Sequence, residues 1–143
     1  MLASSGAIYG DQVDQPLKES VTPNPRSPYA VSKLAAEYYV RTIGGLWGIE
    51  TVSLRIFNAY GPGQHLPPSH PPVVPHYLRQ ALRGGTLVAH GDGNQTRSYC
   101  YIDDCVEGIE RLMRSDHHEP LNLGTDRLIT VNGLVDLVSG IAG

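Results

Sequence analysis

Short apolar runs alternate with helical patterns along this 143-residue chain, and this alternation limits the possible fold more than any other feature. The clearest helical pattern covers 29–46, where apolar residues recur at spacings of three and four. Ser27 and Pro28 just before it are typical of an N-cap and a first helical position. The run 51–57 is apolar and β-branched, which predicts a strand. Strands that alternate with helices predict an α/β protein.

The same reasoning divides the rest of the chain. Residues 10–27 and the proline-rich segment 60–75 are predicted to be loops. Helices are also expected at 73–82, from Asp103 or Asp104 as cap to Met113, and at 131–141 with Thr130 as cap. Short strands are expected at 87–89, 96–102 and 121–123, with a turn at 91–94.

Composition excludes several classes of protein. Eleven Lys and Arg against fourteen Asp and Glu give a net charge of −3, so no basic field indicates nucleic-acid binding. No apolar run approaches the roughly 18–20 residues of a membrane span, and the N-terminus lacks a signal-peptide pattern. Cys100 and Cys105 make no disulfide framework. We therefore expect a cytoplasmic protein, and the spacing of its six histidines predicts no metal site.

Tyr29 and Lys33 are the sharpest candidates for chemistry. At a spacing of four they share one face of the expected helix, with roughly 5–6 Å between their Cβ atoms. A nearby ammonium favours a phenolate over a phenol, which makes a tyrosine a usable general base. Ser5 follows a short apolar run, so its hydroxyl is expected at a strand end, where it could polarise a substrate oxygen. Taken alone, this tyrosine–lysine spacing also occurs by chance on helix surfaces.

Four blocks extend the pattern around these residues: ASSGAIYG at 3–10, SPYAVSK at 27–33, LRIFNAYGPG at 54–63 and GDGNQTRSYCYIDD at 91–104. In this order they resemble the extended short-chain dehydrogenase/reductases. More narrowly, the chain is similar to the NAD-dependent nucleotide-sugar epimerases and dehydratases, of which UDP-glucose 4-epimerases are the best-known members. The resemblance covers nearly the whole sequence.

This resemblance implies a role for each of three catalytic residues. Ser5 is expected to hydrogen-bond a sugar hydroxyl, and Tyr29 is expected to remove the proton of that hydroxyl. Lys33 is expected to support Tyr29 and to hold the nicotinamide ribose, so Tyr29 and Lys33 are also expected to bind the NAD cofactor.

The resemblance implies binding roles for three further residues. Phe57 and Asn58 are expected beside the nicotinamide and the substrate diphosphate, with Phe57 binding cofactor and Asn58 binding substrate. Arg97 is expected to contact the nucleotide phosphates, a bidentate role that suits a guanidinium group. The implied partner is a nucleotide sugar that is linked to UDP or GDP.

Two segments of the tail, 95–108 and 119–124, are also similar to GDP-mannose 3,5-epimerases. Those enzymes carry a cysteine acid/base where this sequence has Ala7, and a lysine in a loop that corresponds to 64–75, where this sequence has none. The resemblance therefore favours oxidation and reduction at C4 of the sugar.

No Gly-rich turn of the type that binds the pyrophosphate of NAD occurs in the sequence. We therefore expect a partial Rossmann-like parallel sheet, truncated at both ends and without its dinucleotide-binding N-terminal half. Within a single truncated domain, 1–60 are expected to form the last part of this sheet with the Tyr29 helix. Residues 61–143 are expected to form part of the small substrate-binding lobe.

Two alternatives remain open. Ser5 could be the nucleophile of a small serine hydrolase with Tyr29 or Lys33 as its base. Alternatively, the chain is a non-catalytic, self-associating module in which the tyrosine–lysine face is structural. A truncated sheet leaves an apolar face or edge open, so a homo-oligomer is expected. Trp47 and the pair Tyr38–Tyr39 are accordingly expected in a core or an interface.

Overall fold

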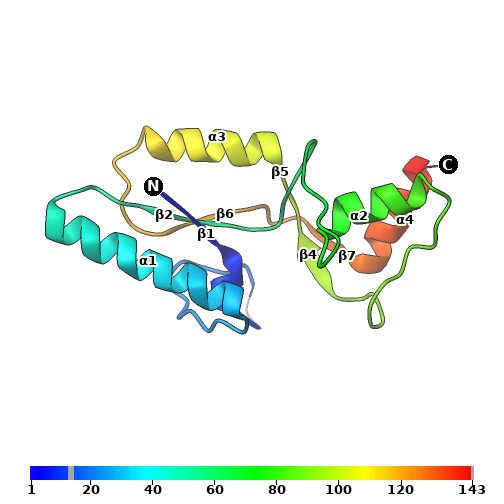
Figure 1. The fold of residues 1–143 in the computed structure, drawn as a ribbon, viewed down its shortest axis with the longest axis horizontal. Coiled ribbons are helices and arrows are strands. Elements are labelled where there is room, and N and C mark those ends of the chain that lie inside the picture. Colours follow the sequence, from blue (N-terminus) through cyan, green and yellow to red (C-terminus); the bar gives the residue numbers. More distant parts are fainter. Residues whose placement is uncertain (13–14, 143) are drawn as a thin grey trace. The chain divides into compact units, whose positions relative to one another are not determined.

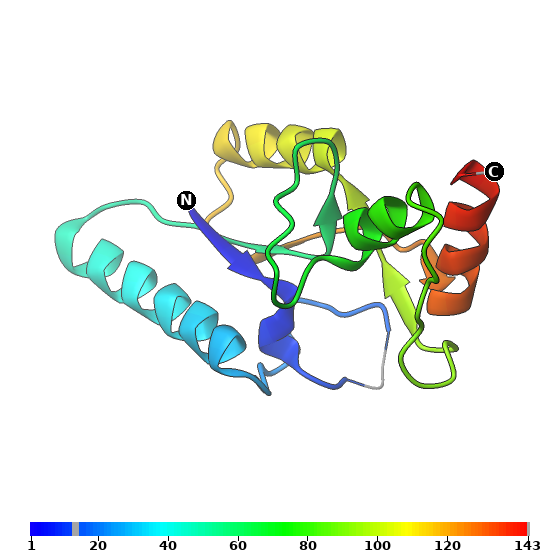
Figure 2. The ribbon, with the colours of Figure 1, turned by 45° about the vertical axis from the view of Figure 1, so that its right-hand side comes forward.

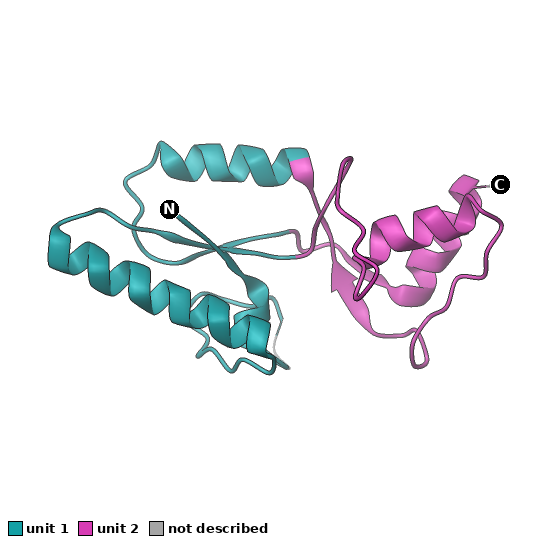
Figure 3. Ribbon diagram, in the orientation of Figure 1, with its two compact units in different colours: residues 1–57, 103–124 teal, residues 58–102, 125–143 magenta. Residues whose placement is uncertain are grey.

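The structure is a computed structural model that describes residues 1–12 and 15–142. Its contacts divide the chain into two compact units (Figure 3). Unit 1 contains Met1–Phe57 and Asp103–Gly124, and unit 2 contains Asn58–Ile102 and Thr125–Gly143. These units differ from the expected division after residue 60 in two segments. Residues 58–60 belong to unit 2, and 103–124 belongs to unit 1, where its strand pairs with a strand of that unit.

Unit 1 is built on a three-stranded parallel sheet. Its strands are β1 (Leu2–Ser5), β2 (Ser53–Ile56) and β6 (Leu121–Leu123), in the order β1-β2-β6. Ser5, the last residue of β1, is the register partner of Ile56, the last residue of β2. The expected α/β class with a parallel sheet is confirmed.

Two helices lie on opposite sides of this sheet, as the two views of the ribbon show (Figures 1 and 2). One is α1 (Pro28–Trp47), which connects β1 to β2. The other is α3 (Ile102–Met113), whose residues from Asp103 onward belong to unit 1. A Cβ atom at Gly108 of α3 would come within 2.5 Å of Leu123 on β6, so helix and strand pack closely.

The termini of α1 follow from side-chain chemistry. Ser27 Oγ accepts a hydrogen bond from the Ala30 amide at 3.1 Å, which satisfies one of the free N–H groups of the first turn. At the other end Gly48 has φ +64°, a left-handed conformation that glycine adopts without a Cβ clash. The predicted helix 29–46 is therefore confirmed, with one more residue at each end.

Unit 2 contains two pairs of short strands. β3 (Ala59–Tyr60) pairs in parallel with β5 (Cys100–Tyr101). β4 (Thr96–Ser98) pairs antiparallel with β7 (Leu128–Thr130). The single strand predicted over 96–102 is thus wrong as one element, because its two halves pair with different partners on either side of Tyr99.

Two helices pack together in unit 2: α2 (Val73–Ala81) and α4 (Val131–Ala142). Tyr77, Leu134 and Val138 form the buried centre of this contact. The predicted helices are confirmed, including the cap at Thr130, whose hydroxyl accepts from the Gly133 amide at 2.9 Å.

Two local predictions are wrong. Residues 87–89 form no strand, and the Val88 carbonyl there accepts a hydrogen bond from the Tyr77 hydroxyl at 2.8 Å instead of a strand partner. Asp103 and Asp104 do not cap α3, because the helix already begins at Ile102. They lie in its first turn, where negative charge complements the helix dipole. No helix of the described residues is long and apolar enough to cross a membrane.

Candidate active site

Tyr29 and Lys33 lie together on the first turns of α1, as their spacing predicts. The Lys33 ammonium nitrogen is 5.8 Å from the centroid of the Tyr29 ring, within the range of a cation–π contact. Tyr29 is 55% exposed, so the residue is open to a ligand. This pair can therefore present a phenol and an ammonium to the same small molecule.

Lys33 also connects this helix to the sheet. Its Nζ donates a hydrogen bond to the backbone carbonyl of Ala3 at 2.9 Å. Ala3 belongs to β1 and stands two residues before Ser5, so both residues face the same side of the strand. The contact fixes the ammonium beside the strand that ends in the predicted catalytic serine.

Ser5 is the last residue of β1 and caps the short 3-10 helix η1 (Gly6–Tyr9). Its Oγ accepts a hydrogen bond from the Ala7 amide at 3.2 Å, and its own O–H can still donate to a ligand. No hydrogen bond joins Ser5 to Tyr29 or Lys33 among the described residues. The hydrolase alternative, which requires a nucleophile bonded to its base, gains no support from these contacts.

Phe57 follows β2 at the same end of the sheet as Ser5. Its ring stacks on Tyr9 with a centroid separation of 6.1 Å and an interplanar angle of 21°. The ring also lies against Gly6, where an added Cβ would overlap Phe57 Cε1. In parallel α/β sheets, ligands bind at the carboxyl ends of the strands, and both Ser5 and Phe57 lie there.

Asn58 and Arg97 belong to unit 2. Asn58 has φ +37°, an uncommon conformation that asparagine tolerates, and its side-chain amide donates to the Ser98 carbonyl at 2.9 Å. Arg97 precedes Ser98 on β4, and its exposed guanidinium donates to the Thr96 carbonyl at 2.8 Å. The six predicted residues thus form two groups, four in unit 1 and two in unit 2.

A buried ion pair in unit 1 escaped the sequence reasoning. Arg55 on β2 and Glu37 on α1 are 5% and 7% exposed, and their closest atoms are 2.8 Å apart. Burial by itself lowers the pKa of Arg55, but hydrogen bonds with Glu37 and Tyr9 offset this, so the net pKa is raised. Two features of the sequence could have indicated this pair: an arginine inside an apolar strand, and a glutamate one helical turn after Lys33.

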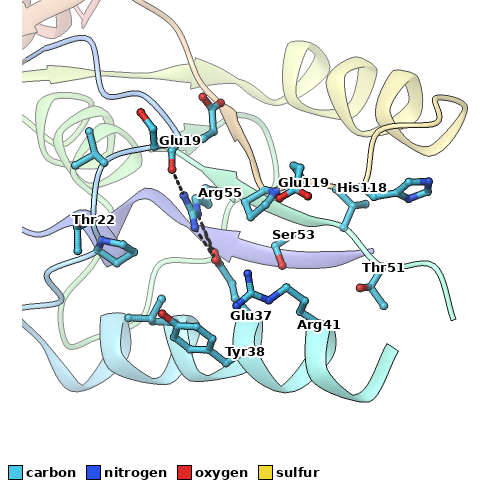
Figure 4. A pocket seen from close by; sticks show the side chains of 16 residues that line it. Glu19, Thr22, Glu37, Tyr38, Arg41, Thr51, Ser53, Arg55, His118 and Glu119 are labelled. Atoms are coloured by element: carbon cyan, nitrogen blue, oxygen red, sulfur yellow. Dashed lines mark hydrogen bonds and ion pairs between the residues drawn. The ribbon is translucent and has the colours of Figure 1, made fainter. Parts of the chain in front are cut away.

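This ion pair forms part of the wall of a cavity of about 350 Å³ within unit 1 (Figure 4). Further polar side chains from α1, from the start of β2 and from the segment before β6 line it, among them Arg41, Ser53 and Glu119. Among the described residues, no set of three or more His, Cys, Asp or Glu side chains could hold a metal ion.

Comparison with known proteins gives one family. Residues 1–124 match the sequence profile described as the NAD dependent epimerase/dehydratase family. Among curated proteins, UDP-glucuronic acid decarboxylase 6 of Arabidopsis thaliana is 38% identical over an alignment of 143 positions, which covers 96% of this chain and 41% of that protein.

Solved structures agree with this match. UDP-glucose 4-epimerase of Thermotoga maritima with UDP-glucose superposes with a TM-score of 0.92 at 37% identity, over 99% of this chain and 46% of that one. UDP-N-acetylglucosamine 4-epimerase of Methanobrevibacter ruminantium, in complex with UDP-N-acetylmuramic acid, gives a TM-score of 0.93 at 32% identity. That match covers 98% of this chain and 45% of that one, so the chain spans less than half the length of these relatives.

Proposed function

Because the chain belongs to the NAD dependent epimerase/dehydratase family, we propose that it carries the proton-transfer site of an enzyme that oxidises and reduces C4 of a UDP-linked sugar. One observation carries this proposal: Lys33 lies beside Tyr29 and is hydrogen-bonded to the strand that ends in Ser5. The choice of UDP over GDP is supported by the relatives, whose names specify UDP-sugars.

In this proposal the chain's own residues handle the proton and orient the sugar. The Ser5 hydroxyl donates a hydrogen bond to the oxygen on C4 and holds that oxygen towards Tyr29. The Tyr29 phenolate oxygen takes the proton of the C4 hydroxyl as the carbon is oxidised, and it returns this proton when the carbon is reduced. Lys33, whose ammonium lies beside the Tyr29 ring, supports Tyr29 in this step.

NAD, when bound, supplies the hydride acceptor and donor for this chemistry. The donor set fits the nicotinamide end of the cofactor, because the exposed Tyr29 hydroxyl and the Lys33 ammonium can both hydrogen-bond ribose hydroxyls. The Gly-rich turn that would hold the pyrophosphate does not occur in these 143 residues. We assign to this chain the nicotinamide end of the site and not the adenosine end.

The two units would divide the remaining work. Unit 1 corresponds in this proposal to the last part of the Rossmann-like sheet, and unit 2 to part of the substrate-binding lobe. Arg97 has guanidinium N–H groups beyond the one that binds Thr96, and these suit a diphosphate. Asn58 is hydrogen-bonded to Ser98 on the strand that carries Arg97, and it would contact the same diphosphate.

We also propose that the chain self-associates through the outer face of α1. This face carries Tyr39, Leu46 and Trp47, which are 69%, 77% and 76% exposed, so the expected core role for Trp47 and the tyrosine pair does not hold in unit 1. A second copy of the same helix is the proposed occupant, because one apolar helix face can be self-complementary across a two-fold axis.

Turnover tests the catalytic proposal. UDP-glucose and NAD are incubated with the chain, and formation of UDP-galactose is followed by proton NMR. Tyr29→Phe removes only the hydroxyl, and we expect it to lower the rate by about 100-fold or more, because positioned acid–base groups contribute 10²–10⁴-fold. Tyr39→Phe is the matched control on the same helix. Equal rates for the wild type and Tyr29→Phe, or no turnover by the wild type, would contradict the proposal.

A further inference from the structure

The Arg55–Glu37 pair is the centre of a larger buried hydrogen-bond network in unit 1. Arg55 Nε donates to Glu37 Oε1 at 3.1 Å, and its Nη2 donates to Oε2 at 2.8 Å, which makes the pair bidentate. Arg55 Nη1 donates to the Tyr9 hydroxyl at 2.7 Å. The Tyr9 hydroxyl in turn donates to Asn122 Oδ1 on β6 at 2.8 Å.

The outer ends of the network bind the loop before α1. The side-chain Nδ2 of Asn122 donates to the Leu17 carbonyl at 3.0 Å, and the backbone N–H of Asn122 donates to Glu19 Oε1 at 2.8 Å. Arg55 Nη1 also reaches the Glu19 carbonyl at 3.3 Å. Figure 4 shows Arg55 between Glu37 and Glu19. Each charged or amide group at the centre therefore has a partner, as a buried polar network requires.

The network joins the same segments that carry the proposed catalytic residues. Glu37 lies four residues after Lys33, one turn further along the same face of α1. Tyr9 is the last residue of η1, the short helix that Ser5 caps. Arg55 itself stands two residues before Phe57. One guanidinium group thus connects the serine segment, the tyrosine–lysine helix and the strand that Phe57 follows.

Stability alone does not account for such a pair. Removing two charges from water is costly, and replacing a buried ion pair by apolar side chains of similar volume is often neutral or stabilising. The bidentate geometry, in contrast, fixes both the distance and the orientation of α1 relative to β2. An apolar contact at this position would hold the helix with less directional constraint.

We infer that Arg55 and Glu37 are positioning residues, which hold α1 so that the Lys33 ammonium reaches the Ala3 carbonyl beside Ser5. This inference rests on the proposed function for its catalytic meaning. Its structural content is independent of that function: without the pair, the hydrogen bond from Lys33 Nζ to Ala3, now 2.9 Å, loosens. A loosened ammonium would support Tyr29 less well.

The chain offers a direct readout, since Lys18 and Lys33 are its only lysines. Lysine labelled with ¹⁵N at the side chain gives two ammonium signals by NMR, and Lys33→Met assigns them. In the wild type, we expect the Lys33 ammonium protons to exchange with water more slowly than those of Lys18, because of the bond to Ala3. This measurement needs neither NAD nor a sugar.

The test variant replaces both partners at once, Glu37→Met with Arg55→Met, so that no unpaired charge is left buried. Circular dichroism checks that it folds, and we expect the exchange difference between Lys33 and Lys18 to disappear. The matched control is Glu110→Met with Arg114→Met, which removes an exposed ion pair between α3 and the residue directly after it and should leave the Lys33 signal unchanged. A folded double variant whose Lys33 exchange stays slow overturns the inference.

A second variant decides the matter if the double variant does not fold. Tyr9→Phe removes the hydroxyl between Arg55 and Asn122 but keeps the ring that stacks on Phe57. We expect faster Lys33 exchange here too, by a smaller factor, and unchanged exchange overturns the inference. A Lys33 response in a chain without turnover would leave the positioning role standing and refute the proposed function. If turnover requires Tyr29 but Lys33 exchange is the same with and without the Arg55–Glu37 pair, the proposed function stands and the positioning role is refuted.

Discussion

Gly6 shows how a single residue without a side chain shapes the candidate site. It lies directly after Ser5, and the Phe57 ring occupies the space where a Cβ would stand. The ring is thereby held between Gly6 and Tyr9 at the carboxyl end of the sheet. The proposed cofactor contact of Phe57 depends on this close approach.

Gly6→Ala should therefore destabilise the chain by about 1–3 kcal/mol, the usual cost of forcing extra volume into a packed site. Urea unfolding followed by circular dichroism measures this. Gly45→Ala on α1 is the control, because a Cβ there meets nothing within 4 Å. It should stabilise the helix by roughly 0.5–1 kcal/mol. Equal stability of Gly6→Ala and the wild type would show that Phe57 moves aside without cost.

At the scale of elements, α1 is the main support of the site, because it carries both Tyr29 and Lys33 in its first turns. These turns depend on the cap at Ser27, two residues before Tyr29. Fraying of this end would reach the tyrosine first. The cap thus bears on the site as well as on helix stability.

Ser27→Ala is expected to lower the free energy of unfolding by about 1 kcal/mol, the typical value for loss of an N-cap. Ser32→Ala provides the control on the same helix, since its hydroxyl only donates back to the Tyr29 carbonyl at 2.7 Å. That change should be neutral or slightly stabilising, because alanine is the better helix former. If the two variants unfold at the same urea concentration, the cap makes no measurable contribution to the free energy of unfolding.

Elements with local signals could be predicted from the sequence, whereas those defined by distant partners could not. Helix α1 has its cap, its periodicity and its terminal glycine within one segment, and the prediction differs from the structure by one residue at each end. Strand β7 and the break at Tyr99 depend on pairings between residues that lie 30 to 41 positions apart in the sequence. At 87–89, where a strand was expected, the Val88 carbonyl is likewise bonded to a distant group, the Tyr77 hydroxyl on α2.

In the candidate site too, contacts between residues close in the sequence could be predicted, and contacts between distant residues could not. The helical spacing predicts that Tyr29 and Lys33 meet, and they do. The bond from Lys33 to Ala3 and the pair Arg55–Glu37 join residues 30 and 18 positions apart, and no local pattern indicates them. The roles in catalysis and binding that the family resemblance implies remain predictions.

At the scale of the whole molecule, the chain crosses between its two units three times. It belongs to a family whose compared members are more than twice as long, and it leaves an apolar helix face exposed. We expect this face to pair with a second copy, so the chain should be a dimer by size-exclusion chromatography with light scattering.

Trp47→Ser with Leu46→Ser should shift this dimer to a monomer, because both side chains lie on the exposed end of α1. The paired control is Met113→Ser, an equally exposed apolar residue at the end of α3. It should leave the dimer intact. A wild-type chain that is monomeric at micromolar concentration would refute self-association.

We assign the nicotinamide end of a cofactor site to Tyr29 and Lys33, and saturation-transfer NMR with nicotinamide mononucleotide tests this assignment most directly. This probe lacks the adenosine half, for which the chain has no Gly-rich turn. We predict saturation of the nicotinamide and ribose protons in the wild type and in Lys18→Met, and its loss in a folded Lys33→Met variant. No transfer in the wild type, or equal transfer in Lys33→Met, would contradict the claim.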